Sequence, residues 1–470
     1  MAPFKIAVEG CCHGSLNHIY TALESKCQSR GWTIEDLDFL IICGDFQVIK
    51  SAEHTPCCGL SDNRFQAVRN ERDLNCMSVP RKYRQMGDFH LYYSGKKRAP
   101  VLTLVIGGNH EASNYFSELH YGGWLAPNIY YMGAANVLRF GPLRIAGLSG
   151  IFHRGNYNKP HYECLPYDRD EVRSVYHVRQ CDISKLLNVR SAVDIGLSHD
   201  WPRRVEYHGD CERLFAGRPH FLKSAKTDNL GSEPAERVLN HLRPRFWFSG
   251  HMHVKFRATV EHNDEATVDF FQNLDVPREL QKQLPRPVRT WKKPRNRPPG
   301  ITNTTTHFLA LNKPSPDGDF LELLEIDSCW DVNDPSVAPY LPKTPGAKFS
   351  LHYDEEWLSI LRATDSDGAT ETGGTSLGGP MGPAVTSLQD GADESRAYVR
   401  ANVTAKGLLR IPDNFQTHAP AYRGLDTTHG DEQPCEYPNS QTEALCELLG
   451  ITTSRADEPA SGDEFVVFEE

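Results

Sequence analysis

The chain has 470 residues, of which 39% are hydrophobic and 10% aromatic, so it is long enough for one large domain with a core and a smaller region beside it. It contains no run of roughly eighteen apolar residues and does not start like a signal peptide, so we expect a soluble intracellular protein without a membrane partner. Its 13 cysteines are too sparse for a disulfide scaffold and lack CxxC zinc spacing, which predicts mostly reduced, structural thiols.

The formal net charge of −10 is unevenly distributed along the chain. Residues 1–300 contain 41 Lys and Arg against 32 Asp and Glu, whereas residues 301–470 contain 10 against 29. A basic body can attract a phosphate backbone, and an acidic end can limit nonspecific binding. Charge alone equally allows an ordinary domain with a solvated acidic tail.

Short apolar runs rich in β-branched residues predict a series of buried strands in the first half of the chain. They cover residues 4–8, 37–43, 101–106, 128–132, 136–148 with a turn at Gly141-Pro142, 193–197 and 246–249. Residues 16–23, after the first strand, carry apolar side chains at helical spacing and predict an amphipathic helix. The predicted fold class is therefore α/β.

Five of these strands end in polar side chains that are suited to chemistry. In chain order, these side chains are Cys11 with His13, Asp45, Asn109 with His110, His199, and His251 with His253. The carboxyl ends of strands in an open α/β sheet share one edge, so we expect these groups to meet there.

The donors suit two metal ions bridged by one carboxylate. Asp45 can give one oxygen to each of two ions about 3.5 to 4 Å apart, and imidazoles, the Asn109 amide oxygen and a thiolate can complete the shells. Such a pair can hold a phosphate oxygen and lower the pKa of a bridging water, which indicates phosphoester hydrolysis. A thiolate from Cys11 favours softer ions than Mg²⁺ and makes the site sensitive to oxidants. In the alternative interpretation, Cys11 is only a small buried residue.

Residues 48–66 interrupt this pattern. The stretch is polar and aperiodic, and it ends by repeating the Phe-Gln of positions 46 and 47. One hypothesis is that these 19 residues are a retained intron in the gene model, and the other is a surface loop insertion. A transcript that carries these codons in every clone would refute the first.

A long polar stretch, residues 149–179, follows the strand 136–148. Loops of this length inside a domain are usually functional or disordered. Interleaved aromatic and basic side chains can stack on bases and hold phosphates, which favours a contact with nucleic acid. The candidate substrate-binding residues are Phe152, Arg154, Tyr157, Lys159, Tyr176 and Arg179.

The composition changes after residue 262, so we expect a catalytic domain over residues 1–262. Residues 263–300 predict a basic, Pro-rich linker, in which residues 292–297 form a candidate nuclear-localisation signal. A carboxyl-terminal region should then cover residues 301–363, with a helix over 354–363, and resume at 396–451 after a disordered stretch at 364–395. Residues 452–470 form an acidic tail.

The order of the motifs resembles that of the calcineurin-like metallophosphoesterases, D-x-H, G-D, G-N-H-[DE], H and G-H-x-H. This chain matches at every step but the first, where Cys11 stands in place of an aspartate. Segments 10–14, 107–114, 121–131, 198–202 and 253–256 are similar to the RNA lariat-debranching branch of that superfamily. The likeness covers residues 4–260 and returns in 351–365 and 439–451.

The resemblance implies a β-sandwich flanked by helices. The implied reaction is hydrolysis of the 2′-5′ phosphodiester at the branch point of excised intron lariats, and the expected location is the nucleus. It assigns Cys11, His13, Asp45 and His253 to one metal, and Asp45, Asn109, His199 and His251 to the other. His110 would protonate the leaving 2′-oxygen or stabilise the phosphoryl charge, and residues 149–179 would be the lariat recognition loop. The implied cofactors are two divalent ions, Fe²⁺, Zn²⁺ or Mn²⁺. The implied partners are branched lariat RNA and, as further candidates, splicing-associated proteins.

Two other functions stay open at this point. One is a general calcineurin-like phosphoesterase that acts on phosphoproteins, cyclic nucleotides or DNA ends. The substitution at Cys11 and the long basic, aromatic loop argue against it. The other is a noncatalytic scaffold of the same fold, which would have lost metal ligands, whereas every ligand position is filled here.

Overall fold

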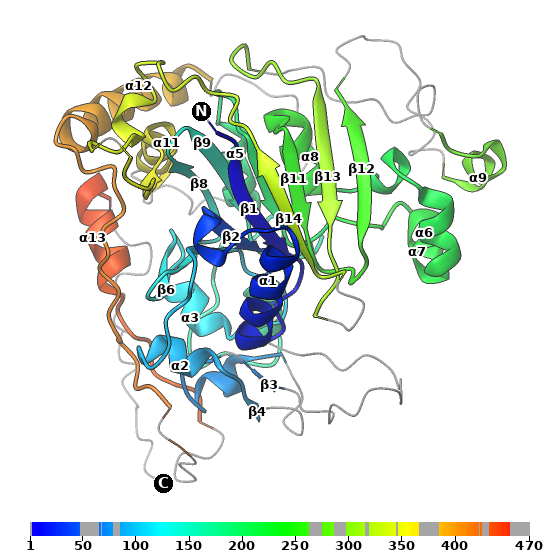
Figure 1. Ribbon diagram of the computed structural model, residues 1–470, viewed down its shortest axis with the longest axis horizontal. Coiled ribbons are helices and arrows are strands. Elements are labelled where there is room, and N and C mark those ends of the chain that lie inside the picture. The colour runs from blue at the N-terminus through cyan, green and yellow to red at the C-terminus, as the bar shows by residue number, and fades with distance from the viewer. Residues whose placement is uncertain are drawn as a thin grey trace, which may run out of the picture.

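The computed structural model describes residues 2–47, 65–66, 68–78, 85–262, 275–285, 298–314, 319–344, 346–365, 385–422, 424 and 432–451 (Figure 1). The strands are β1 (Phe4–Glu9), β2 (Phe39–Ile42), β3 (Phe65–Gln66), β4 (Gln85–Met86), β5 (Thr103–Val105), β6 (Gly123–Ala126), β7 (Ile129–Tyr131), β8 (Ala135–Phe140), β9 (Leu143–Leu148), β10 (Ile195–Ser198), β11 (Phe246–Ser249), β12 (Phe256–Glu261), β13 (Thr305–Ala310), β14 (Leu321–Ile326) and β15 (Leu351–Tyr353). The α-helices are α1 (Leu16–Ser29), α2 (Phe89–Tyr93), α3 (Ser113–Glu118), α4 (Glu171–Ser174), α5 (Gln180–Leu187), α6 (Cys211–Gly217), α7 (Pro219–Ala225), α8 (Glu233–Leu242), α9 (Arg278–Gln283), α11 (Glu355–Asp365), α12 (Val385–Val399) and α13 (Ser440–Leu449). Short 3₁₀ turns lie at η1 (Ile34–Asp36), η2 (Asp73–Cys76), η4 (Val205–His208) and η5 (Ala338–Tyr340), and a π-helix at η6 (Arg400–Thr404).

Two mixed sheets form the centre of the fold. The first has the strand order β14-β1-β2-β5-β7-β6, and the second has the order β12-β13-β11-β10-β9-β8-β15. Strands β1, β2, β5 and β7 run parallel in the first sheet, and β9, β10, β11 and β13 run parallel in the second. Parallel strands bring their carboxyl ends to one edge of each sheet, which is where the polar motifs follow in the sequence.

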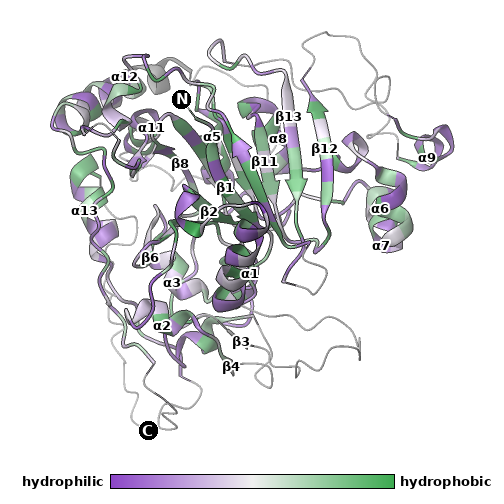
Figure 2. Cartoon of the chain, viewed as in Figure 1, coloured by the Kyte–Doolittle hydropathy of each residue, from purple (hydrophilic) through white to green (hydrophobic). Residues whose placement is uncertain are grey.

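The core has three layers because successive strand residues face opposite sides of a sheet. In β2, Phe39 and Ile41 join a buried cluster that also takes Leu197 from β10, so this cluster lies between the two sheets. The alternate residues Leu40 and Ile42 pack with side chains of α1, α2 and α3. A third cluster packs α5, α8 and α11 on the outer face of the second sheet. This arrangement confirms the predicted β-sandwich flanked by helices, and Figure 2 shows hydrophobic residues concentrated on the central strands.

The carboxyl-terminal region that we predicted to be separate completes both sheets. β14 pairs with β1 in the first sheet, and in the second sheet β13 pairs with β11 and β15 with β8. A buried ion pair strengthens this junction, because Arg144 of β9 contacts Asp354 at 2.6 Å (Nη2–Oδ1) and Glu356 at 2.8 Å (Nη2–Oε2). The predicted division at residue 262 therefore separates parts of the sequence that share one sandwich.

Helices occupy both ends of the stretch 364–395, where we predicted disorder. α11 continues to Asp365, and α12 begins at Val385. Packing on α11 stabilises the end of α12 and the turn that follows it. Val399, the last residue of α12, and Val403 of η6 are buried in the same cluster as Trp357 of α11.

Several predictions concern residues outside the described ranges. Of the proposed insertion 48–66, only residues 65–66 are described, so neither hypothesis about it is tested. The candidate nuclear-localisation signal and the acidic tail are outside as well, and in the described part of 263–300 residues 278–283 form α9. Among the described residues, no helix is both long and apolar enough to cross a bilayer, and the described cysteines are free thiols.

Candidate metal centre

The side chains that follow the five predicted strand ends meet at one place. They follow β1, β2 and β5 in the first sheet and β10 and β11 in the second. A cavity of about 860 Å³ opens over them and is lined by Asp45, Asn109, His110, His251 and His253. The predicted convergence of the strand ends is confirmed.

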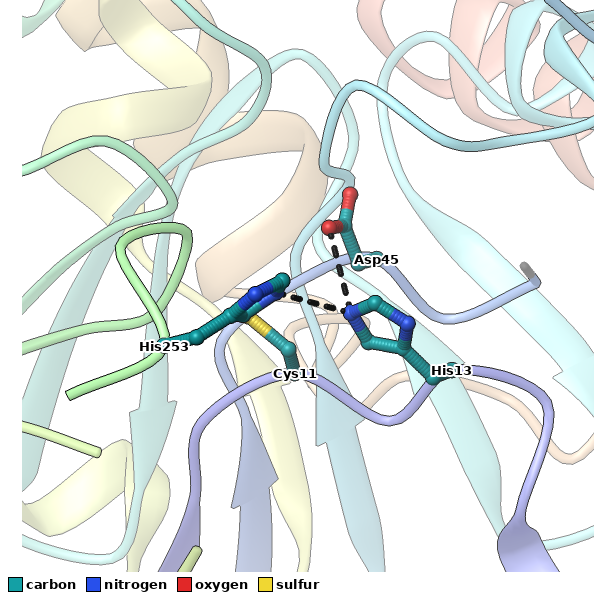
Figure 3. A group of neighbouring side chains, drawn as sticks. All are labelled: Cys11, His13, Asp45 and His253. Carbon is teal, nitrogen blue, oxygen red and sulfur yellow. Dashed lines mark hydrogen bonds and ion pairs between the residues drawn. The ribbon is translucent and has the colours of Figure 1, made fainter. Parts of the chain in front are cut away.

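The first group of donors comprises Cys11, His13, Asp45 and His253, whose ligand atoms all lie within 4.8 Å of one another. The Nε2 atoms of His13 and His253 are 3.0 Å apart, and His13 Nε2 is 3.5 Å from Asp45 Oδ2. Figure 3 shows these side chains pointing toward one another from three loops, with Cys11 and His13 on the same one. One sulfur, two ring nitrogens and one carboxylate oxygen form a donor set that fits a divalent transition metal.

The second group lies on the other side of the same carboxylate. His199 Nε2 is 3.2 Å from Asp45 Oδ1 and 3.3 Å from Asn109 Oδ1, and the His251 ring lies beside that of His199 with centroids 5.0 Å apart. The Nδ1–H of His199 donates to the Cys43 carbonyl at 2.6 Å, which leaves Nε2 directed at the site. The two oxygens of Asp45 therefore face different donor groups, as a bridging carboxylate requires.

Burial sets the protonation of the donors. It lowers the pKa of His13 well below its usual value and that of His253 to about 3, so both imidazoles are in the neutral form that binds metals. Burial alone would raise the pKa of Asp45, but His199 and His110 hold it well below its ordinary value. Burial, and then the charge of Asp45, raise the pKa of the Cys11 thiol, so an incoming metal ion must displace its proton.

The backbone at these donors is strained. Among the described non-glycine residues with positive φ are His13 (49°), Asp45 (47°), His251 (64°) and His253 (49°). Such conformations cost about 1 to 3 kcal/mol each and cluster at functional sites, where the surrounding structure enforces them. These residues lie in the short loops that follow β1, β2 and β11, where the backbone must turn sharply at the strand ends.

Two further features hold the Asp45 loop against the turn after β5. A Cβ on Gly108 would overlap the backbone nitrogen and Oδ1 of Asp45, so only glycine allows this approach. The buried Glu111 carboxylate accepts the N–H of Gly108 at 2.7 Å, of Phe46 at 2.9 Å and of Gln47 at 3.0 Å. We assigned no role to Glu111 from the sequence, because its hydrogen bonds cross between distant segments.

The six predicted substrate-binding residues differ in whether they line the cavity. Phe152 and Arg154 line the cavity, whereas Tyr157, Lys159 and Tyr176 are not among its lining residues. The prediction is wrong for Arg179, which is fully buried, pairs with Glu163 and donates to the Ser174 carbonyl at 3.0 Å. Its guanidinium holds the loop 149–179 together, so it cannot contact a phosphate in solvent.

Sequence reasoning did not single out four basic groups in the cavity, His153, Arg203, His220 and Lys313. Lys313 follows β13, and Arg203 lies two residues after the segment 198–201 that carries His199. The rule that located the metal donors, a polar group just beyond a strand, applies to both. His220 lies on α7, and no signal in the sequence pointed to it.

A two-sheet sandwich with these donors at its strand ends defines a calcineurin-like phosphoesterase. The family model described as calcineurin-like phosphoesterase matches residues 4–255, and that described as lariat debranching enzyme, C-terminal domain, matches residues 303–454. The second match begins at the segment that supplies β13, β14 and Lys313 to the site.

Curated relatives specify the family. The chain is 38% identical to the lariat debranching enzyme of Homo sapiens over 447 residues, which cover 95% of this chain and 69% of that protein. It is 36% identical to the enzyme of Arabidopsis thaliana, with 98% and 89% covered, and 35% identical to that of Schizosaccharomyces pombe, with 97% of each covered. The chain belongs to the lariat debranching enzyme family.

Proposed function

We propose that this protein hydrolyses the 2′-5′ phosphodiester bond at the branch point of excised intron lariats. The observation that carries the proposal is the placement of the Asp45 carboxylate between two groups of donors, in the lining of an open cavity of about 860 Å³. Membership of the lariat debranching enzyme family supports the substrate.

The donor groups fit a pair of divalent ions. Cys11, His13, Asp45 and His253 would hold one ion, and Asp45, Asn109, His199 and His251 the other. When bound, the ions supply Lewis-acid stabilisation of the phosphoryl charge and activation of water. The mixed sulfur, imidazole and oxygen donors support Fe²⁺, Zn²⁺ or Mn²⁺ as the ions.

His110 is the group that we assign to proton transfer. It lines the cavity next to the second donor group, and its Nε2 lies 3.2 Å from the Asn109 amide nitrogen. Water attacks the phosphorus, the bond from phosphorus to the 2′-oxygen breaks, and His110 gives that oxygen its proton. The products are a 2′-hydroxyl on the branch nucleotide and a 5′-phosphate on the released strand.

Basic and aromatic groups around the rim would bind the RNA. Phe152 offers a stacking surface, and the Arg203 guanidinium already lies over its ring at 5.7 Å. Burial is the main cause of the lowered pKa of His13 and His253, and Lys313 lies close enough to the centre that its charge lowers both further. A cation at this position can bind a phosphate next to the scissile bond, so β13 brings a substrate contact into the site.

Cleavage of a synthetic branched RNA tests the proposal against a general phosphoesterase. We expect the protein to open the 2′-5′ linkage far faster than it hydrolyses nitrophenyl phosphate, because the rim groups contact only the RNA. His110→Ala should lower kcat on branched RNA by roughly 10²- to 10⁴-fold without loss of bound metal. Comparable rates on both substrates would favour the general enzyme, and a purified protein that binds no metal would favour a noncatalytic scaffold.

We also propose that the protein acts in the nucleus, with splicing-associated proteins as partners. Two points support this location: the proposed substrate forms during mRNA splicing, which takes place in the nucleus, and residues 292–297 form a candidate nuclear-localisation signal. Microscopy of the tagged full-length chain, with and without substitution of that segment, tests the location.

A further inference from the structure

A second cluster of metal-binding side chains lies outside the catalytic cavity. It comprises His120, just after α3, His161, in the loop 149–179, and Asp182, in the first turn of α5. His161 Nε2 is 2.7 Å from Asp182 Oδ2, and His120 Nε2 is 3.9 Å from Asp182 Oδ1. Potential ligand atoms of the three residues all lie within 4.8 Å of one another, although they come from three separate segments.

The carboxylate at the centre of this cluster needs a cationic partner. The Asp182 side chain is only 4% exposed, and a buried carboxylate is costly unless it is paired. Lys185 is close in sequence, but its ammonium pairs with Asp365 at 2.9 Å. Burial would raise the pKa of Asp182, whereas His161, His120 and Lys185 lower it, so the carboxylate is ionised.

The geometry points to a third metal site, in which His120, His161 and Asp182 bind one Zn²⁺ ion. Two imidazoles and one carboxylate are an established ligand combination for this ion. The two histidine side chains are 28% and 23% exposed, so solvent can fill the remaining coordination position. Their rings are already close, with centroids 4.9 Å apart, and small shifts of these half-buried side chains suffice to surround an ion.

An ion at this position would brace the loop 149–179 against the catalytic turn. A cavity of about 60 Å³ is lined by all three residues, by Gly108 and Glu111 of the turn after β5, and by further residues of that loop. None of the three lines the larger catalytic cavity. The role that follows is structural: the ion fixes the base of the loop that carries Phe152 and Arg154.

The competing explanation is an ion pair between His161 and Asp182 without any metal, for which the 2.7 Å contact is sufficient. The two explanations differ at His120. A simple ion pair does not need a second imidazole at 3.9 Å, whereas a metal site loses a ligand when this imidazole is removed.

Metal stoichiometry decides between them. The full chain is stripped with a chelator, reloaded with excess Zn²⁺, passed through gel filtration and analysed for zinc per chain. We expect His120→Gln and His161→Gln each to retain one ion fewer than the wild type, and His18→Gln, which alters an exposed histidine of α1, to match the wild type. If both cluster variants retain as much zinc as the wild type, the site does not exist.

A folding defect would not hide the result. His161→Gln removes the main partner of Asp182 and is the variant at risk, but His120→Gln leaves the His161 contact in place. Circular dichroism identifies which variants are folded, and the zinc content of folded His120→Gln alone then confirms or overturns the site. Because zinc content is independent of cleavage, the outcome is separate from that of the proposed function.

Discussion

Replacing Lys313 with Gln tests whether the carboxyl-terminal region contributes directly to substrate binding. Two unit charges about 4 Å apart interact by roughly 1 kcal/mol in water and roughly 4 kcal/mol at an effective dielectric constant of about 20. Lys313 is half-buried at the rim of an open cavity, so the lower part of this range applies. A loss of about 1.4 kcal/mol corresponds to a tenfold weaker complex.

The assay is binding of a branched RNA to Lys313→Gln over a range of salt concentrations. One lost phosphate contact should reduce the slope of log affinity against log salt by about 0.7, the value for single strands. Lys313→Arg should keep most of the affinity, because it keeps the charge. Lys348→Gln is the matched control, since Lys348 is an exposed lysine of the same region that lines a different cavity.

Two results would refute this reasoning. If the affinity and the salt slope of Lys313→Gln equal those of the wild type, the lysine does not contact a phosphate. If the variant instead loses bound metal, its role is to support the centre and not to bind RNA. Metal analysis of the same preparation separates these cases.

Three further predictions concern the metal centre and the junction between the two regions. Cys11→Asp should keep its metal and its cleavage activity but lose sensitivity to peroxide, because a carboxylate has no thiolate to oxidise; equal inactivation of both forms would contradict this. Gly108→Ala should fold but bind less metal, since its methyl group displaces the bridging carboxylate, whereas Gly217→Ala, whose Cβ meets nothing within 4 Å, should match the wild type in metal content. Asp354→Asn should lose roughly 3 kcal/mol of unfolding free energy at pH 7, because it removes the buried carboxylate that pairs with both Arg139 and Arg144 and leaves Arg144 only Glu356. Burial raises the pKa of Asp354, but the charges of Arg144 and Arg139 and the hydrogen bonds to the carboxylate together hold it below its ordinary value. This stability is therefore present above the ordinary Asp pKa and is lost as the pH falls through the folded-state pKa. Urea unfolding should therefore show the gap between wild type and variant closing in acid; a constant gap would contradict the assignment.

The sequence predicted the convergence of these polar side chains because the required information is local. Each donor lies a few residues after an apolar run, and parallel strands bring such positions together whatever the order of the strands. Asp45 and His199 illustrate this, because 154 positions separate them in the numbering and yet their side chains lie 3.2 Å apart. The roles of these residues as ligands stay a prediction until metal is measured.

Long-range pairing accounts for what the sequence did not reveal. Nothing near β13 or β14 indicates that these strands pair with β11 and β1, so Lys313 was not placed beside the centre. Arg179 was mistaken for a phosphate contact because its neighbours in sequence are aromatic and basic. Its actual partner, Glu163, lies 16 positions earlier and reaches it only when the loop folds back.

The most direct test of the central claim is cleavage of a branched RNA by chelator-stripped protein during titration with Mn²⁺. If the convergent donors hold the ions that drive hydrolysis, the stripped protein should be inactive. Activity should then rise with bound Mn²⁺, and only the 2′-5′ bond should open while the 3′-5′ bonds of the same molecule stay intact. Cleavage of the branch by metal-free protein, or metal binding that never restores it, would contradict the account.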